Sequence, residues 1–317
     1  MVADAEEVGY LPSGIIIRGI AGFYYVAAKD DGVYECRARG IFRKKGLTPL
    51  TGDRVVFSVT DPAGKKGNIE ERTERSSVLV RPAVANVDQI IAVIAAKSPD
   101  PDLMLLDKIL VTAEDKGIRA VVCINKIDLD EGGKRARLRE PYIKAGYEVI
   151  ETSFRESDGF SKLKEALKGH ISVFAGQSGV GKSTLLNRVM DTVLMKTGSV
   201  SEKIERGRHT TRHAELIELP GGGYLVDTPG FSSFELTGIE YDRLQFLYPE
   251  FAEHIPKCRF KGCSHVFEAD CAVKKAVDER SIEKGRYARF AELYKTLKQE
   301  DEAKYKKGGR KGMKGND

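Results

Sequence analysis

The pattern of hydrophobic and polar residues divides the chain into three parts. Between about residues 14 and 82, short segments rich in Ile, Val, Tyr and Phe alternate with Gly, Asp and Pro; they read GIIIRG, GFYYVAA, GVYECRARG and DRVVFSV. Such segments are typical of β-strands, and turns at regular intervals favour a small barrel. We therefore predict an all-β domain at residues 1–80.

Apolar runs become longer in the middle of the chain, and segments with helical spacing, such as 103–116 and 160–167, separate them. The runs are IIAVIAA at 90–96, AVVCIN at 120–125, YEVIETS at 147–153, ISVFAG at 171–176 and YLVDTPG at 224–230. This alternation predicts a largely parallel sheet with helices on both faces. We expect an α/β domain at residues 81–236, with ligands at the carboxyl ends of its strands.

The last part of the chain, residues 237–317, is charged and helical, and a Cys/His cluster interrupts it. One long helix is predicted from Ser281 to Lys307, ended by Gly308 and Gly309, and a basic tail follows. The fold class is therefore multidomain: an N-terminal all-β barrel, a central α/β domain and a C-terminal helical domain.

Composition narrows the class of protein. Hydrophobic residues make up 41% and charged residues 31% of the chain, which is enough apolar content for a folded core. No apolar run is long enough to span a membrane, and the N-terminus lacks the pattern of a secretory signal. Five cysteines, three of them close together, do not form a disulfide framework. We expect a cytoplasmic monomer with reduced thiols and no membrane contact.

The segment 176–183 matches the phosphate-binding loop pattern G-x-x-x-x-G-K-S, between a predicted strand and a predicted helix. Its backbone N–H groups can surround phosphates, Lys182 can neutralise the β- and γ-phosphates as a catalytic group, and Ser183 can bind Mg²⁺. The expected nucleotide contacts are Gly176, Gln177, Ser178, Gly179, Val180, Gly181, Lys182, Ser183 and Thr184.

A second motif selects the base. Asn125, Lys126 and Asp128 form an NKxD pattern at the end of a predicted strand. A carboxylate there accepts from guanine N1–H and from the N2 amine together, and adenine lacks both donors. Thr152 and Ser153 end the next strand and are expected to add contacts to guanine.

Two further segments are expected at the γ-phosphate. Asp227 in DTPG is expected to hold Mg²⁺ in the second sphere, and the Gly230 amide to contact the γ-phosphate. In the upstream stretch GRHTTR, one of Thr210 and Thr211 is expected to bind Mg²⁺ in the triphosphate state. The sequence leaves open which of the two threonines does so.

Phe231 follows DTPG, where Ras-like enzymes place a glutamine that orients the attacking water. A phenyl ring cannot make that hydrogen bond, so intrinsic hydrolysis should be slow. His209 is the best replacement in cis, because an imidazole acts near neutral pH. Alternatively, His209 only contacts a partner or packs the loop; Arg208 is a weaker candidate for stabilising the transferring charge.

The order of the motifs is unusual, because Asn125 precedes Gly176 by 51 residues, whereas Ras-like domains place the phosphate loop first. The sequence therefore predicts a circularly permuted domain. One consequence is that DTPG leads towards the Cys/His cluster. We hypothesise that the nucleotide state is transmitted mechanically to the C-terminal domain.

Cys258, Cys263, His265 and Cys271 offer three thiolates and one imidazole within 14 residues. This is a full tetrahedral set for Zn²⁺ with no open position, which predicts one structural zinc ion. Because the segment has little apolar content, metal binding would supply its folding energy, of order 10 kcal/mol or more. His254 is a competing ligand with poorer spacing.

A barrel followed by NKID, GQSGVGKST, GRHTTR, DTPGF and CxxxxCxHxxxxxC resembles the ribosome small-subunit-dependent GTPases of the RsgA/YjeQ family, over nearly the whole chain. The resemblance implies an OB-fold barrel and a GTPase that binds the 30S subunit and its 16S rRNA late in subunit maturation. Hydrolysis to GDP would be stimulated by the subunit and would time release. The resemblance implies a hydrophobic residue at the position of the glutamine, as Phe231 is, and it implies that His209 is the family's switch histidine. Arg212 replaces a threonine common in the family, and an acidic VADAEE replaces its basic N-terminal arm.

Two other functions are compatible with these residues. One is a guanine-nucleotide-gated RNA-binding module whose hydrolysis is incidental; the other is a zinc-dependent enzyme regulated by GTP, which the closed ligand set disfavours. Tyr24, Tyr25, Tyr34 and Phe42 stand among basic residues, which suits nucleic-acid contact, but they can equally fill the barrel core.

Overall fold

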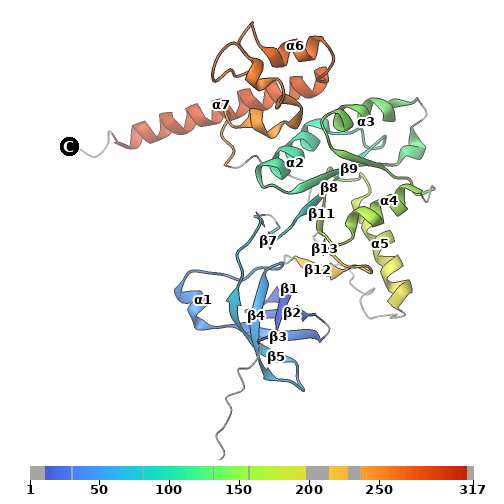
Figure 1. The fold of residues 1–317 in the computed structure, drawn as a ribbon, viewed down its shortest axis with the longest axis vertical. Coiled ribbons are helices and arrows are strands. Elements are labelled where there is room, and N and C mark those ends of the chain that lie inside the picture. Colours follow the sequence, from blue (N-terminus) through green and yellow to red (C-terminus); the bar gives the residue numbers. More distant parts are fainter. Residues whose placement is uncertain are drawn as a thin grey trace, which may run out of the picture. The chain divides into compact units, whose positions relative to one another are not determined.

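The computed structural model describes residues 11–29, 31–80, 82–130, 132–155, 158–197, 214–227, 236 and 238–312 (Figure 1). The chain divides into two compact units. The first comprises Met1–Gln89, Leu167–Val173 and Met190–Phe231, and the second Ile90–Ala166, Phe174–Val189 and Ser232–Asp317. The expected three-domain boundaries at residues 80 and 236 stay a prediction. Within the described ranges, no helix is long and apolar enough to cross a membrane.

The first unit contains a closed five-stranded barrel. Its strands are β1 (Ser13–Ile20), β2 (Phe23–Ala28), β3 (Gly32–Ala38), β4 (Arg54–Asp61) and β5 (Lys66–Arg72). They pair in the order β1-β2-β3-β5-β4, and β4 pairs again with β1. The short helix α1 (Gly40–Lys44) follows β3. This closure confirms the predicted barrel, and its five strands are those of an OB-fold.

Burial in the barrel shows which of the four aromatic residues with two possible roles, RNA contact or core packing, belong to the core. Its apolar residues include Ile16, Phe57 and Ile69, each 0% exposed. Tyr34 and Phe42 are buried in the same core, so these two rings fill the barrel. Tyr24 and Tyr25 are only partly buried and stay candidates for surface contact.

The first unit also holds β12 (Glu215–Glu218), β13 (Tyr224–Asp227) and the start of β11 (Ile171–Ala175). β13 pairs in parallel with β11 and antiparallel with β12, and β12 pairs with β1 of the barrel. A separate two-stranded sheet joins β6 (Val78–Leu79) and β7 (Val84–Ala85).

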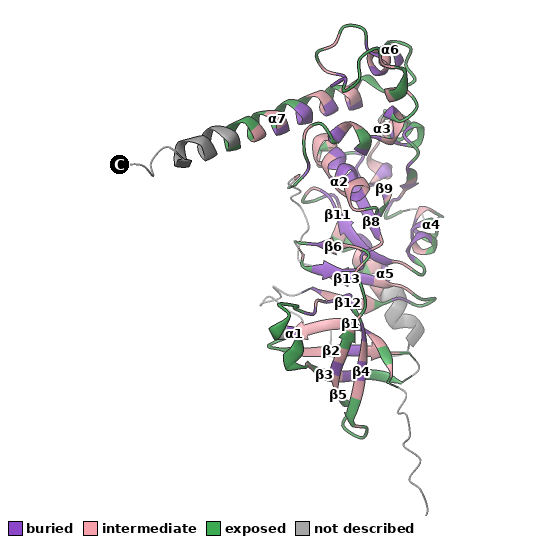
Figure 2. Cartoon of the chain, turned by 60° about the vertical axis from the view of Figure 1, so that its left-hand side comes forward, coloured by how far each residue is buried: buried purple, intermediate pink, exposed green. Residues whose placement is uncertain are grey.

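The second unit is the α/β part. Its sheet has the order β10 (Glu148–Glu151), β9 (Arg119–Asn125), β8 (Gln89–Ala95) and β11. In Figure 1, α2 (Leu103–Asp115) and α3 (Lys134–Lys144) lie on one side of these strands, and α4 (Asp158–Leu167) and α5 (Lys182–Thr197) on the other. Figure 2 shows β8 and β11 buried along their whole length, as their continuous apolar sequences require.

The C-terminal part of this unit is helical. It contains the 3-10 turns η2 (Leu244–Leu247), η3 (Pro249–Phe251) and η4 (Ile255–Lys257), then α6 (Ala272–Asp278) and α7 (Lys284–Gly312). The start of α7 differs from the expected Ser281, because the Glu283 carboxylate accepts the backbone N–H groups of Gly285 and Arg286 and caps the helix there. The helix also continues through Gly308 and Gly309 to Gly312.

Candidate functional site

The loop between β11 and α5 has the backbone that a phosphate cradle needs. Gly176, Gly179 and Gly181 have φ values of 144°, 82° and 99°, which side-chain-bearing residues rarely adopt. A Cβ at Gly176 would lie 2.1 Å from the Val93 carbonyl oxygen, and one at Gly181 would lie 2.4 Å from Asn125 Nδ2. The glycines of the motif therefore let the loop pass close to two neighbouring strands.

Lys182 begins α5 and folds back over this loop. Its Nζ donates to the carbonyl oxygens of Gly176, at 2.6 Å, and of Gln177, at 2.9 Å. Burial lowers the pKa of Lys182, because it disfavours the charged amine. An anionic ligand beside the amine would act in the opposite direction and stabilise the charged form. Ser183 and Thr184 are exposed at the first turn of the helix, where N–H groups and a hydroxyl face solvent. This arrangement suits a polyphosphate.

Asn125 connects three segments of the site. Its Nδ2 donates to the Val180 carbonyl oxygen in the phosphate loop, at 2.9 Å, and its Oδ1 accepts from the Thr152 hydroxyl, at 3.0 Å. Lys126, with a left-handed backbone (φ 59°), donates from Nζ to the carbonyl oxygens of Gly179, at 2.7 Å, and of Ser98. The NKID segment is therefore held to the phosphate loop by hydrogen bonds from Asn125 and Lys126 to backbone carbonyl groups of the loop.

Asp128 presents a carboxylate that the protein has already oriented. The Ser153 hydroxyl donates to its Oδ1 at 2.9 Å, and Arg155 Nε lies 3.8 Å from its Oδ2. The side chain of Asp128 keeps 18% of its surface exposed. A carboxylate fixed in this way can receive the two donors of a guanine edge. Ser98 and Arg155 could not be predicted as site residues, because neither belongs to a motif.

The remaining predicted nucleotide residues are divided between described and undescribed parts of the chain. Asp227 ends β13 and is partly exposed. His209, Thr210, Thr211 and Gly230 lie outside the described residues, as do Arg208 and Phe231. The roles expected for them at Mg²⁺ and at the attacking water stay predictions.

The Cys/His cluster closes around one point. The ligand atoms of Cys258, Cys263, His265 and Cys271 all lie within 4.8 Å of one another, and His254 is not part of the group. Cys258 Sγ is 3.5 Å from His265 Nδ1 and 3.9 Å from Cys271 Sγ. The last two distances are close to the edges of a tetrahedron around zinc, about 3.5–3.8 Å for ordinary Zn–N and Zn–S bonds. The four residues can hold a metal ion.

Two neighbouring features prepare this cluster for a metal. His265 Nε2 lies 2.8 Å from Gln245 Oε1, and if it donates there, Nδ1 is left free to bind the metal. Burial and the nearby Cys271 raise the pKa of the Cys263 thiol to about 12. A bare cluster would therefore keep its protons, and a cation is needed to stabilise the thiolates.

Comparisons with known proteins show which family the chain resembles over most of its length. The RsgA N-terminal domain family matches residues 13–69, and the RsgA GTPase family matches residues 72–237. The small ribosomal subunit biogenesis GTPase RsgA of Ruminiclostridium cellulolyticum is 57% identical over 295 residues, 93% of this chain and 96% of the relative. The protein with the same name from Geobacillus thermodenitrificans is 46% identical over 292 residues, 91% of this chain and 98% of the relative.

Two solved structures share the fold over almost the whole chain. YloQ, described as a circularly permuted GTPase, has a TM-score of 0.79 and 38% identity, and the match covers 94% of this chain and 99% of YloQ. YjeQ from Thermotoga maritima has a TM-score of 0.78 and 36% identity, and the match covers 91% of this chain and 99% of YjeQ.

Proposed function

Because this chain belongs to the RsgA family of GTPases, we propose that it hydrolyses GTP in the biogenesis of the small ribosomal subunit. One observation carries the proposal: the hydrogen bond from Asn125 to Val180 joins the guanine-selecting segment to the phosphate loop. The two motifs, 51 residues apart and in permuted order, therefore form one site in the folded chain.

The roles within the site follow from chemistry. The backbone N–H groups of the loop and the amine of Lys182 hold the phosphates, and Asp128 accepts from guanine N1–H and N2–H, with Ser153 orienting it. Ser183 and either Thr210 or Thr211 would hold Mg²⁺, with Asp227 in its second sphere, and the ion would neutralise charge on the β- and γ-phosphates. His209 orients the attacking water in place of the glutamine that Phe231 replaces.

The C-terminal cluster takes one structural zinc ion. The donor set of three thiolates and one imidazole is closed, and its spacing fits tetrahedral Zn²⁺. The metal holds the turns between η4 and α7 together and takes no part in hydrolysis.

The partner is the 30S subunit, contacted through 16S rRNA by a cytoplasmic monomer. The barrel supports this assignment, because Arg18 lies 4.3 Å from the ring centre of Tyr25 and Arg37 lies 4.6 Å from that of Phe23. Paired cations and partly exposed rings suit contact with RNA phosphates and bases.

Sedimentation with purified ribosomal subunits tests the partner. We expect the chain to pellet with 30S subunits in the presence of a non-hydrolysable GTP analogue, to be released with GDP, and to pellet less as salt rises. The 50S subunit is the matched control. Equal binding to both subunits, or binding that ignores the nucleotide, would contradict the proposal.

A further inference from the structure

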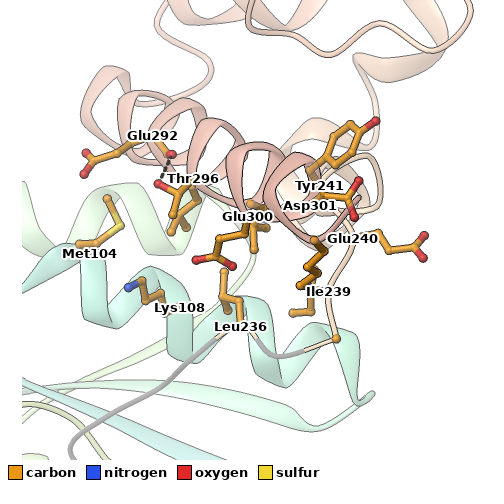
Figure 3. Close-up of a pocket in the computed structure, with 14 residues that line it drawn as sticks. Met104, Lys108, Leu236, Ile239, Glu240, Tyr241, Glu292, Thr296, Glu300 and Asp301 are labelled. Atoms are coloured by element: carbon orange, nitrogen blue, oxygen red, sulfur yellow. Dashed lines mark hydrogen bonds between the residues drawn. The ribbon is translucent and has the colours of Figure 1, made fainter. Parts of the chain in front are cut away.

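A groove with a volume of about 490 Å³ lies between α2, α7 and a segment of the second unit made up of Leu236 and residues 238–241 (Figure 3). Its floor is apolar: Met104 comes from α2, Leu236 and Ile239 come from the segment, and Leu293 and Leu297 come from α7. Leu293 and Leu297 are one helical turn apart and lie on one face of α7. Both leucines are largely buried, at 4% and 8% exposed, so each adds a small apolar surface to the floor.

The rim of the groove has the opposite charge to the chain as a whole. Glu240, Glu292, Glu300 and Asp301 line it, against the two lysines Lys108 and Lys304, whereas the whole chain has a net charge of +5. Across the part of the chain that the structure describes, none of these four carboxylates forms an ion pair. The carboxylates are available to an incoming cation.

We propose that this groove binds a short basic segment of a partner protein, with aliphatic side chains on the floor and lysine or arginine at the rim. Acidic rims attract such peptides and repel nucleic-acid phosphates, so RNA is not the occupant. The site is a protein-docking surface, separate from the nucleotide site and from any rRNA contact of the proposed function.

The dimensions of the groove specify the peptide further. The lining residues of α7 run from Glu292 to Lys304, which is about 18 Å at the helical rise. An extended peptide of about five or six residues covers that length. Leu293 and Leu297 are about 6 Å apart along the helix, close to the spacing of alternate residues in a strand. The preferred segment therefore carries two aliphatic residues two positions apart, flanked by cations.

Fluorescence anisotropy with the full-length chain tests the proposal. The probe is a labelled hexapeptide in which two leucines two positions apart are flanked by lysine and arginine. We expect saturable binding that Glu300→Lys weakens about five- to tenfold, because a rim contact becomes a repulsion. Glu302→Lys is the matched control: it makes the same charge change on the same exposed helix but lies outside the groove lining.

The peptide controls separate the groove from general charge attraction. Replacing both leucines by serine should weaken binding at least about tenfold, because the floor then buries no aliphatic side chain. Equal losses in Glu300→Lys and Glu302→Lys, or equal binding of the serine peptide, would overturn the proposal. Tighter binding of a peptide with the chain's own residues 303–317 would also overturn the proposal, because it would assign the groove to a second copy of the chain. Competition by a short single-stranded RNA would overturn it as well.

Discussion

Asn125 illustrates how a single side chain assembles the nucleotide site. Its side-chain amide donates to Val180 in the phosphate loop and accepts from Thr152, just after β10. Both polar atoms of the amide therefore bond to other parts of the protein. The motif predicted this residue, but its contacts could not be predicted, because they join positions that are 55 and 27 residues away. Ser98 and Arg155 were missed for the same reason.

Our proposal assigns base selection to Asp128. We predict that Asp128→Asn shifts preference from GTP towards XTP, because an amide can donate to the additional xanthine oxygen and can no longer accept both guanine donors. Ser153→Ala should keep the preference for GTP and weaken binding about fivefold, since it removes only one orienting hydrogen bond. Competition between the two nucleotides in a binding assay measures both effects, and unchanged selectivity in Asp128→Asn would remove guanine recognition from this residue.

Our proposal assigns phosphate binding to Lys182. We predict that Lys182→Ala weakens GTP binding about 10- to 100-fold, because a charge-assisted contact in a partly buried site is lost. Titration with a fluorescent GTP analogue measures the change. Lys144→Ala, which removes an exposed lysine from α3, is the control and should bind normally. If Lys182→Ala also binds normally, the phosphate-loop assignment is wrong.

Among the elements, hydrophobic runs predicted most strands of both units and missed β5, β12 and the two-residue strands β6 and β7. β5 reads KGNIEER, and a Cβ at Gly67 would lie 2.5 Å from the Ser58 carbonyl oxygen and 3.2 Å from Cys36 Sγ. Close packing rather than apolar content holds this strand between β3 and β4. Such a strand has no signal in its own sequence, because its stability comes from its neighbours.

Helix α7 is fastened to α2 by a buried ion cluster. Asp107 is 0% exposed and accepts from Arg286 Nη1 at 2.7 Å and from Arg289 Nε at 2.6 Å; Arg286, 1% exposed, also pairs with Glu250. The rings of Tyr142, Tyr147 and Tyr248 surround Arg286. The C-terminal helices are therefore anchored to the α/β part, which restricts how a nucleotide signal could move them.

Replacing one member of this ion cluster should show how much the cluster contributes to the free energy of unfolding. We predict that Arg286→Met destabilises the chain by about 3–5 kcal/mol, because Glu250 loses its charge partner in a buried position and Asp107 keeps only Arg289. Lys284→Met on the same helix, at an exposed position, should have almost no effect. Urea denaturation and hydrogen exchange of α2 and α7 measure the difference. A normal stability for Arg286→Met would mean that packing alone holds the helices.

The Cys/His cluster lies among the turns before α7. We predict one zinc ion per chain, lost in His265→Ala and kept in His254→Ala, since only His265 faces the three thiols. Chelation should increase hydrogen exchange between η4 and α7 and leave GTP affinity unchanged, because the metal supplies folding energy only locally. Metal analysis of the two variants checks the ligands. Retention of zinc by His265→Ala, or its loss from His254→Ala, would contradict the ligand set.

At the scale of the whole molecule, the motifs predicted a permuted nucleotide site but not the compact units. The contact pattern places β12 and β13 with the barrel and places the C-terminal helices with β8–β10. Pairings such as β4 with β1 and β1 with β12 join distant segments, and their register depends on the completed fold. Local sequence patterns therefore predicted most helices and strands and the candidate nucleotide motifs. The strand pairings and the division into compact units could be seen only in the structure.

GTP turnover with and without purified 30S subunits, at two salt concentrations, tests whether this chain is a GTPase that the small subunit stimulates. We predict slow turnover by the chain alone, because Phe231 cannot orient water, and strong acceleration by 30S but not by 50S subunits, weaker at high salt. His209→Ala should bind GTP normally and lose most of the accelerated rate. Normal GTP binding with no acceleration by 30S subunits would contradict the account and leave a guanine-nucleotide-gated module whose hydrolysis is incidental.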